Sequence, residues 1–149
     1  MLVTKFSSLI MIQNISQSSP GRITGIGGIF LRSSQVEAMN AWYSQKLGLE
    51  IGPYGVVFPW KDHENPELPG STCWNVMEKA NDYFLVEGQT YMVNYRVDNL
   101  SLLLEKLKAE GIESLKPVEH HDFGSFAWIL DPDGNQIELW EPKDSGLGL

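Results

Sequence analysis

One carboxylate, Glu138, lies in the middle of an otherwise apolar segment and could do chemistry there. Ile137 precedes it, Leu139 follows it, and the turn sequence DPDGN occupies positions 131–135. Turn residues between two β-prone segments are typical of a hairpin, so Glu138 is predicted to lie on a paired strand. A carboxylate in an apolar setting can ligate a metal ion, transfer a proton or orient a ligand. Glu138 is therefore our candidate catalytic residue.

The elements that must position Glu138 follow an internal repeat. Residues 28–36, GIFLRSSQV, align with residues 92–100, MVNYRVDNL, because each joins an extended segment and an Arg to a polar helix-capping pair. Hydrophobic periodicity predicts strand, helix, strand, strand and strand in each half. The first half is predicted to hold a strand at 23–32, a helix at 35–47 and strands near 50–52, 55–60 and 72–78. The second is predicted to hold a strand at 91–97, a helix at 100–110 and strands near 113–118, 124–130 and 136–141.

Alternate residues of these strands should point to opposite faces of the sheet. One face is apolar and is expected to cover the helices. The other mixes aromatic and Met side chains with a few polar groups, a composition that suits a concave ligand site. We expect this second face to bind a small organic molecule through Phe30, Asn75, Met92, Arg96, Phe126, Trp128 and Trp140.

Glu138 needs partners on that face, because an ionised carboxylate in apolar surroundings is costly without them. By strand parity the expected partners are Arg96 and Arg32, and such a pair would lower the pKa of Glu138 and favour a structural or ligand-orienting role. Without the pair, burial would raise the pKa of Glu138 and make it a candidate general base. Trp128 and Trp140 are expected to lie directly across the hairpin from each other, beside Glu138.

Composition narrows the possible partners and surroundings. A net charge of -8 with only 11 Lys and Arg residues argues against binding to nucleic acid or to an anionic membrane. Cys73 is the single cysteine and permits no internal disulfide, which favours a reducing, cytoplasmic location. We expect residues 1–20 to form a disordered or loosely docked tail, and residues 21–149 to form a single domain.

With the repeat in place, the sequence resembles the vicinal oxygen chelate superfamily of glyoxalases, bleomycin resistance proteins and extradiol dioxygenases. The resemblance covers roughly residues 22–142 and rests on ITGIGGIFLRS, WYSQKLGLEI, MVNYRVDNLSLLLEKLKAEGI and FAWILDPDGNQIELWEP. It implies an α+β fold of two tandem βαβββ modules, at about 22–79 and 91–142. Their mixed sheet would curl into a half-barrel cup with the helices on its outer face, commonly in a homodimer.

The resemblance also implies where a metal ion would lie, on the first and last strands of each module. The matching positions here are Gly28, Asn75, Met92 and Glu138. A divalent cation needs three or more oxygen or nitrogen ligands, and Glu138 is the one strong ligand among the four. We therefore predict no metal ion and no other cofactor. The segments His120-His121-Asp122 and Asp62-His63-Glu64 are interpreted as exposed polar residues on a strand end and a loop.

Three functions remain open from the sequence. The first is binding of a small organic molecule in the cup without a metal, as bleomycin resistance proteins bind their ligand. The second is a metal-dependent glyoxalase-type lyase or extradiol-type dioxygenase that uses Glu138, so whether the protein is an enzyme stays undecided. The third is a non-catalytic interaction domain, which is favoured if the protein's own side chains or the tail at residues 1–20 fill the cup.

Overall fold

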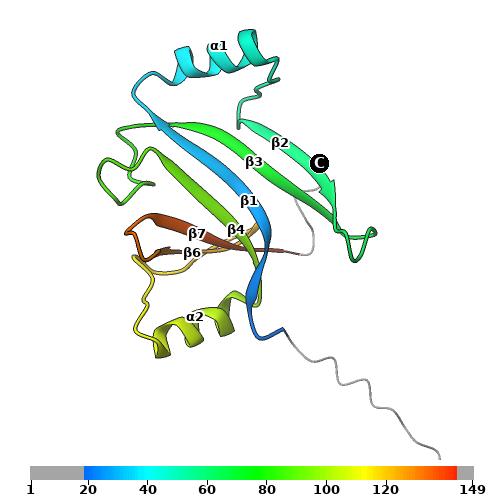
Figure 1. Ribbon diagram of the computed structural model, residues 1–149, viewed down its shortest axis with the longest axis vertical. Coiled ribbons are helices and arrows are strands. Elements are labelled where there is room, and N and C mark those ends of the chain that lie inside the picture. Colours follow the sequence, from blue (N-terminus) through cyan, green and yellow to red (C-terminus); the bar gives the residue numbers. More distant parts are fainter. Residues whose placement is uncertain (1–18, 144–149) are drawn as a thin grey trace, which may run out of the picture.

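The computed structural model describes residues 19–143, so the expectation for the tail falls mostly outside the described residues. Seven strands form one mixed sheet in the order β2-β3-β1-β4-β7-β6-β5, with two helices beside it (Figure 1). The elements in chain order are β1 (Arg22–Ser33), α1 (Val36–Leu47), β2 (Val56–Lys61), β3 (Pro69–Glu78), β4 (Tyr91–Asp98), α2 (Leu100–Ala109), β5 (Glu119–His121), β6 (Gly124–Leu130) and β7 (Gln136–Pro142).

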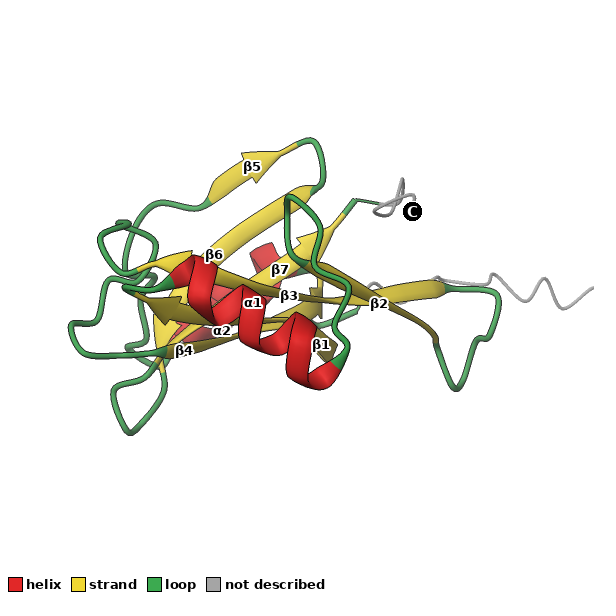
Figure 2. Ribbon diagram, turned by 90° about the horizontal axis from the view of Figure 1, so that it is seen from above, coloured by secondary structure: helices red, strands yellow, loops and turns green. Residues whose placement is uncertain are grey.

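The two halves of the chain share one topology, except that the second half has one more strand, β5. β1 pairs in parallel with β3, and β4 pairs in parallel with β7. β1 and β4 then pair antiparallel at the centre of the sheet and join the halves. The sheet curls without closing (Figure 2), so the predicted α+β fold with a curled mixed sheet is confirmed.

Two predicted strands are wrong. The segment 113–118 is irregular, since the Ser114 hydroxyl donates to the Lys116 carbonyl and Pro117 has no amide hydrogen to donate to a ladder. The strand there, β5, begins at Glu119 and has three residues. The predicted strand at 50–52 is reduced to an isolated bridge between Gly52 and Gly55. The first half therefore contributes three strands instead of four.

Local turn chemistry fixes the hairpin that carries Glu138. The Asp131 side chain accepts from the backbone N–H groups of Asp133 and Asn135, and Gly134 takes a φ of 81° that favours glycine. β6 and β7 consequently pair antiparallel, which confirms the predicted paired strand. At α2 the side chain of Asn99, which belongs to the polar pair Asp98-Asn99 at the end of MVNYRVDNL, accepts from Leu102 N and caps the helix.

Buried apolar residues form two clusters on opposite faces of the sheet. One packs between α2 and the sheet and consists of Val97, Leu100, Ala127, Ile129 and Leu139. The other lies on the opposite, inner face and consists of Phe84, Met92, Phe126, Trp128 and Trp140. α1 contributes no buried residue and touches the sheet chiefly where Tyr43 meets Trp74 of β3, with 4.8 Å between ring centroids. Among the described residues, neither helix has the length and apolar character needed to span a bilayer.

Candidate functional site

Strand register assembles the inner face of the sheet from rows of residues. The first row runs across five strands as Cys73, Gly28, Asn94, Glu138 and Trp128. The second row is Gly25, Arg96, Trp140 and Phe126, and the third is Asn75, Phe30 and Met92. All seven predicted ligand-binding residues and Glu138 therefore lie on one face.

The hairpin register differs from the prediction by two residues. Trp128 lies opposite Glu138, and Trp140 lies opposite Phe126, so the expected Trp128–Trp140 pair is wrong. A shift of two residues leaves each side chain on its expected face, because the strand period is two. The consequence is that Glu138 has one Trp directly beside it on β6.

Glu138 is completely buried and is held by uncharged donors. The Tyr83 hydroxyl donates to its Oε2 atom, and the Asn94 Nδ2 group donates to its Oε1 atom at 2.5 Å. The predicted pairing of Glu138 with Arg96 or Arg32 is wrong. Arg32 donates instead to the backbone carbonyls of Lys79 and Val86, at 2.9 and 3.4 Å.

Burial dominates the ionisation of this group. It raises the pKa of Glu138 above the usual value, and the hydrogen bonds from Tyr83 and Asn94 lower it only in part. Burial, followed by the charge of Glu138, raises the pKa of Tyr83 as well, so the phenol stays a neutral donor. Glu138 thus has the pKa direction expected of a general base, but both of its oxygens are occupied by protein groups.

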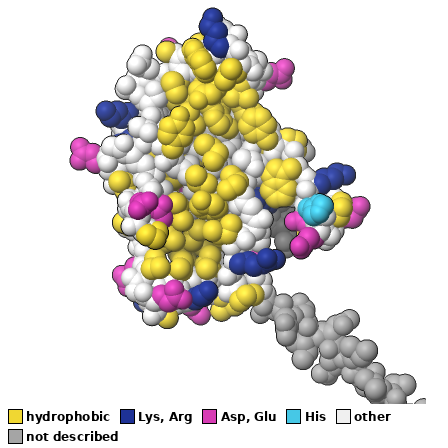
Figure 3. All heavy atoms as spheres, in the orientation of Figure 1, with side chains coloured by type: hydrophobic (Ala, Val, Ile, Leu, Met, Phe, Trp, Pro, Cys, Tyr) yellow, Lys and Arg dark blue, Asp and Glu magenta, His cyan; other side chains and the backbone are white. Residues whose placement is uncertain are grey.

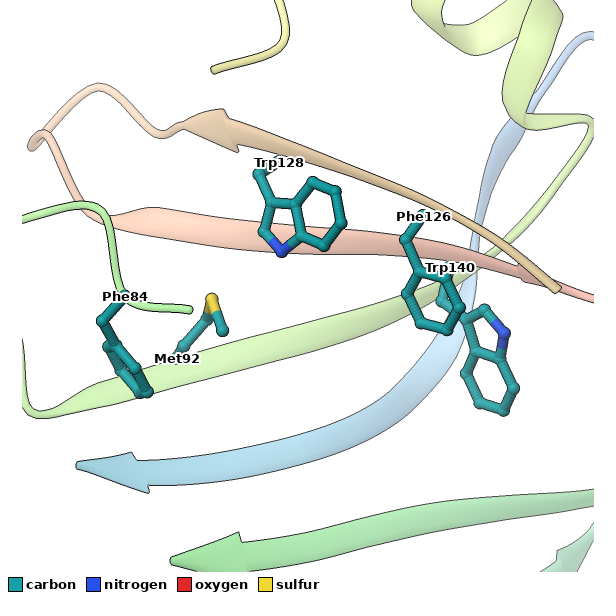
Figure 4. Close-up of a cluster of buried hydrophobic side chains, with 5 residues drawn as sticks. All are labelled: Phe84, Met92, Phe126, Trp128 and Trp140. Atoms are coloured by element: carbon teal, nitrogen blue, oxygen red, sulfur yellow. The ribbon is translucent and has the colours of Figure 1, made fainter. Parts of the chain in front are cut away.

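The segment 79–90, here called the connector, covers Glu138. Tyr83 and Phe84 of the connector pack onto the inner face, where Phe84 joins the cluster drawn in Figure 4. Gln136 fixes the connector: its Oε1 atom accepts from Leu85 N at 2.6 Å, and its Nε2 atom donates to the Tyr83 carbonyl at 2.9 Å. Met92 and Trp128 are each only 1% exposed beneath it.

The covering of Glu138 by the connector was not predicted from the sequence. The apolar run Tyr83-Phe84-Leu85-Val86, flanked by polar residues of the connector, was the signal that it packs against the core. As the structure stands, Met92, Phe126, Trp128 and Trp140 present little surface to a ligand. Their proposed contact with a ligand stays a prediction, and for Met92 and Trp128, which lie beneath the connector, it requires the connector to move.

A second feature of the inner face is more open. The Arg96 guanidinium carbon lies 4.8 Å from the ring centroid of Trp140 and 5.4 Å from that of Trp60. We call these three residues the Arg96 clamp. Trp60 of β2 was not among the predicted site residues because it reaches Arg96 across Gly25, a contact that strand alternation within one module does not reveal. Arg96, Phe30 and Asn75 are each only partly buried.

The four positions implied for a metal ion do not fit a divalent cation. Gly28 has no side chain, Met92 offers a thioether buried among aromatic rings, and both Glu138 oxygens accept hydrogen bonds from the protein. Within residues 19–143, no group of three or more His, Cys, Asp or Glu side chains is arranged to hold a metal ion.

The two adjacent His residues point to local partners. His120 Nδ1 lies 2.8 Å from the Ser125 hydroxyl, and His121 Nε2 lies 3.1 Å from a Glu119 carboxylate oxygen. Both His side chains are exposed.

Known proteins share this architecture. A family model described as Glyoxalase/Bleomycin resistance protein/Dioxygenase superfamily matches residues 25–139. Methylmalonyl-CoA epimerase from Mycobacterium tuberculosis has a TM-score of 0.55 at 14% identity, covering 83% of this chain and 91% of that chain. A variant of the Streptomyces coelicolor methylmalonyl-CoA epimerase in complex with 2-nitronate-propionyl-CoA has a TM-score of 0.61 at 13% identity, covering 83% and 97%.

A glyoxalase/bleomycin resistance protein/dioxygenase superfamily member from Vibrio splendidus 12B01 has a TM-score of 0.50 at 12% identity, covering 80% of this chain and 99% of that chain. No curated protein sequence matches the chain. At such low identity these likenesses establish the fold alone, and function must be argued from the site.

Proposed function

The chain belongs to the glyoxalase/bleomycin resistance protein/dioxygenase superfamily, and on that premise we propose that it binds a small organic molecule at the inner face of its sheet without a metal ion. The supporting observation is that Phe30, Asn75 and Arg96 share this face and are only partly buried, although the rest of it is packed. Apolar walls with a few polar groups are what such sites use to bind and orient ligands. A metal-dependent lyase or dioxygenase is not proposed, because the donor set does not suit a divalent cation.

A tryptophan fluorescence titration tests this function. A small-molecule library is titrated against the wild type, and the best ligands are repeated with Phe30→Ala, Asn75→Ala and the control Ser101→Ala. Ser101 is exposed on α2 and makes no contact with the inner face. Affinity should fall in the two inner-face variants and stay unchanged in the control. If a ligand binds both inner-face variants with the affinity of the wild type, it binds elsewhere on the protein.

The filled part of the inner face favours a second candidate, a non-catalytic interaction domain. Tyr83 and Phe84 occupy the space over Glu138, so this part of the cup is closed. Such a protein would contact its partners through its outer surface and not through the cup. In that case no library compound should bind the inner face. The titration above therefore separates the two candidates.

We also propose that the partner at the outer face of the sheet is a second copy of the chain. Apolar side chains gather between α1 and α2 on the face shown in Figure 3. Ile26, Ile29, Val93 and Tyr95 share one side of β1 and β4, and Ile26 is 39% exposed. An exposed apolar patch between two helices suits a self-complementary two-fold contact.

Sedimentation velocity tests the dimer. The wild type should sediment as a dimer, and Ile26→Lys should shift it to a monomer because a charge would be buried in the contact. The control is Leu130→Lys, which places the same charge at an exposed residue on the opposite face. A monomeric wild type, or a dimer that survives Ile26→Lys, contradicts this interface.

A further inference from the structure

The Arg96 guanidinium is a partly buried cation without an acceptor. Within residues 19–143 its side chain makes no hydrogen bond and no salt bridge, whereas its backbone carbonyl accepts from Thr24 Oγ1 at 3.3 Å. Burial lowers the pKa of Arg96, which reflects the loss of water around the charge. The five N–H donors of this partly buried guanidinium have no acceptor in the described chain, so a bound molecule could supply one.

The clamp holds Arg96 in one place. The Trp60 indole N–H donates to the Thr72 hydroxyl at 3.0 Å, and the Trp140 indole N–H donates to the Phe123 carbonyl at 3.0 Å. Each ring is thus fixed at its polar end while its face contacts the guanidinium. Cation–π contacts with the two rings orient the charge but use none of its N–H groups.

Glycine makes room for the clamp. A Cβ at Gly27 would collide with Asn94 and Trp140, and a Cβ at Gly70 would collide with the Trp60 ring. The backbones of β1 and β3 therefore pass directly beside the clamp side chains. The irregular pairing of β1 with β4 between Ile26 and Gly28 lies at the same point.

The electrostatic surroundings leave Arg96 uncompensated. The titratable group that acts on it is the Cys73 thiol, whose own pKa is raised by burial and is lowered in part by Arg96. A thiol with a raised pKa is neutral near pH 7 and supplies no counter-charge. The two carboxylates nearest to Arg96 along the strands have other partners: Asp98 accepts from Arg22 N at 2.8 Å, and Glu138 directs its oxygens to Tyr83 and Asn94.

We propose that the Arg96 clamp binds the carboxylate group of the ligand, so that the small organic molecule recognised at the inner face is an organic acid. This inference rests on the proposed ligand-binding function. A planar guanidinium offers two parallel N–H groups that match the two oxygens of a carboxylate. A single cation flanked by apolar rings suits a monoanion better than a phosphate, which usually recruits several positive or backbone donors. The partly buried Phe30 and Asn75 extend the site along the same face.

The test compares acids with their neutral isosteres. Benzoate, 1-naphthoate and hexanoate are titrated against the full chain by tryptophan fluorescence, each beside its primary amide, with inorganic phosphate as a competitor. At least one acid should bind about tenfold or more tighter than its amide, since hydrogen bonds to a charged group contribute about 1.5–3 kcal/mol. Arg96→Met, which keeps the apolar stem, should weaken that acid by about 10- to 100-fold. Arg96→Lys should weaken binding of the acid less than Arg96→Met does, because it keeps the positive charge.

The following results would contradict the proposal. Acids and amides that bind equally, or acid affinity unchanged in Arg96→Met, would show that Arg96 only braces the two Trp rings. Phosphate that competes as well as the acids would overturn the assignment to carboxylates. Neutral compounds that bind while no acid does would leave the proposed function standing and remove this inference. Should Arg96→Met fail to fold, Arg96→Lys and the acid–amide comparison on the wild type still decide.

Discussion

Replacing Glu138 by Gln should stabilise the protein increasingly as the pH rises. The carboxylate is fully buried and burial raises its pKa, so the fold prefers the protonated form. Stability from a raised pKa is fully present below the pKa of the unfolded chain and is lost as the pH rises through the folded-state value. The loss is about 1.4 kcal/mol for each unit by which the pKa is raised. Glu138→Gln removes that loss because the amide does not ionise.

The hydrogen-bond geometry permits this substitution. The Tyr83 hydroxyl can donate to the new amide oxygen as it donates to Glu138 now. Asn94 can rotate its own amide so that its Oδ1 atom, which is buried and without a hydrogen-bond partner in the described structure, accepts from the new NH2 group. With both contacts kept, the free energies of unfolding of variant and wild type at pH 5 should agree within about 1 kcal/mol.

Urea unfolding followed by tryptophan fluorescence from pH 5 to pH 8.5 measures the difference. The other titrating groups are common to both proteins and cancel in the comparison. Glu105→Gln, at an exposed position on α2, is the control and should show a constant difference from wild type. If the stability of Glu138→Gln relative to wild type stays constant or falls as the pH rises, the fold does not disfavour the charged form of Glu138, and its pKa is not raised.

Three further substitutions test contacts around the site and the cap of α2. Tyr83→Phe removes a hydrogen bond to a buried carboxylate, which should lower the free energy of unfolding by about 1.5–3 kcal/mol, with a larger loss in urea unfolding at pH 8 than at pH 5. Gly27→Ala forces a Cβ into Asn94 and Trp140 and should lower the free energy of unfolding by about 1–3 kcal/mol or more. At Gly52 there is space for a Cβ, so Gly52→Ala should lower it far less in the same assay. Asn99→Ala removes the α2 cap and should lower stability by about 1 kcal/mol, and an unchanged melting temperature would contradict the cap.

Most of the fold could be predicted from local sequence signals. The turn at 131–134 and the cap at Asn99 act through their own side chains and φ angles, so they are visible without tertiary information. The irregular segment 113–118 could not be predicted from its alternating residues, because Ser114 and Pro117 favour local hydrogen bonding and break the ladder. Hydrophobic periodicity predicted both helices but not that they differ in burial: α2 buries Leu100, whereas α1 buries no residue.

The site was predictable only in part, and for a physical reason. Strand parity placed Glu138 and Arg96 on the correct face, and a two-residue error in the hairpin register left that result unchanged. Parity cannot predict partners that arrive from irregular or distant segments. Tyr83 comes from the connector and Trp60 from β2, and these two residues decide what Glu138 and Arg96 each contact.

The division of the inner face into a closed part at Glu138 and a receptive part at Arg96 can be tested directly by NMR. The indole N–H signals of the five Trp residues are assigned by single substitutions, and an organic acid that binds the protein is titrated in. The signals of Trp60 and Trp140 should shift while that of Trp128, covered by the connector, stays in place. A shift at Trp128 with Trp60 unchanged would mean that the ligand displaces Tyr83 and binds at Glu138. That result would contradict both the closure of the face at Glu138 and the binding of the ligand at Arg96.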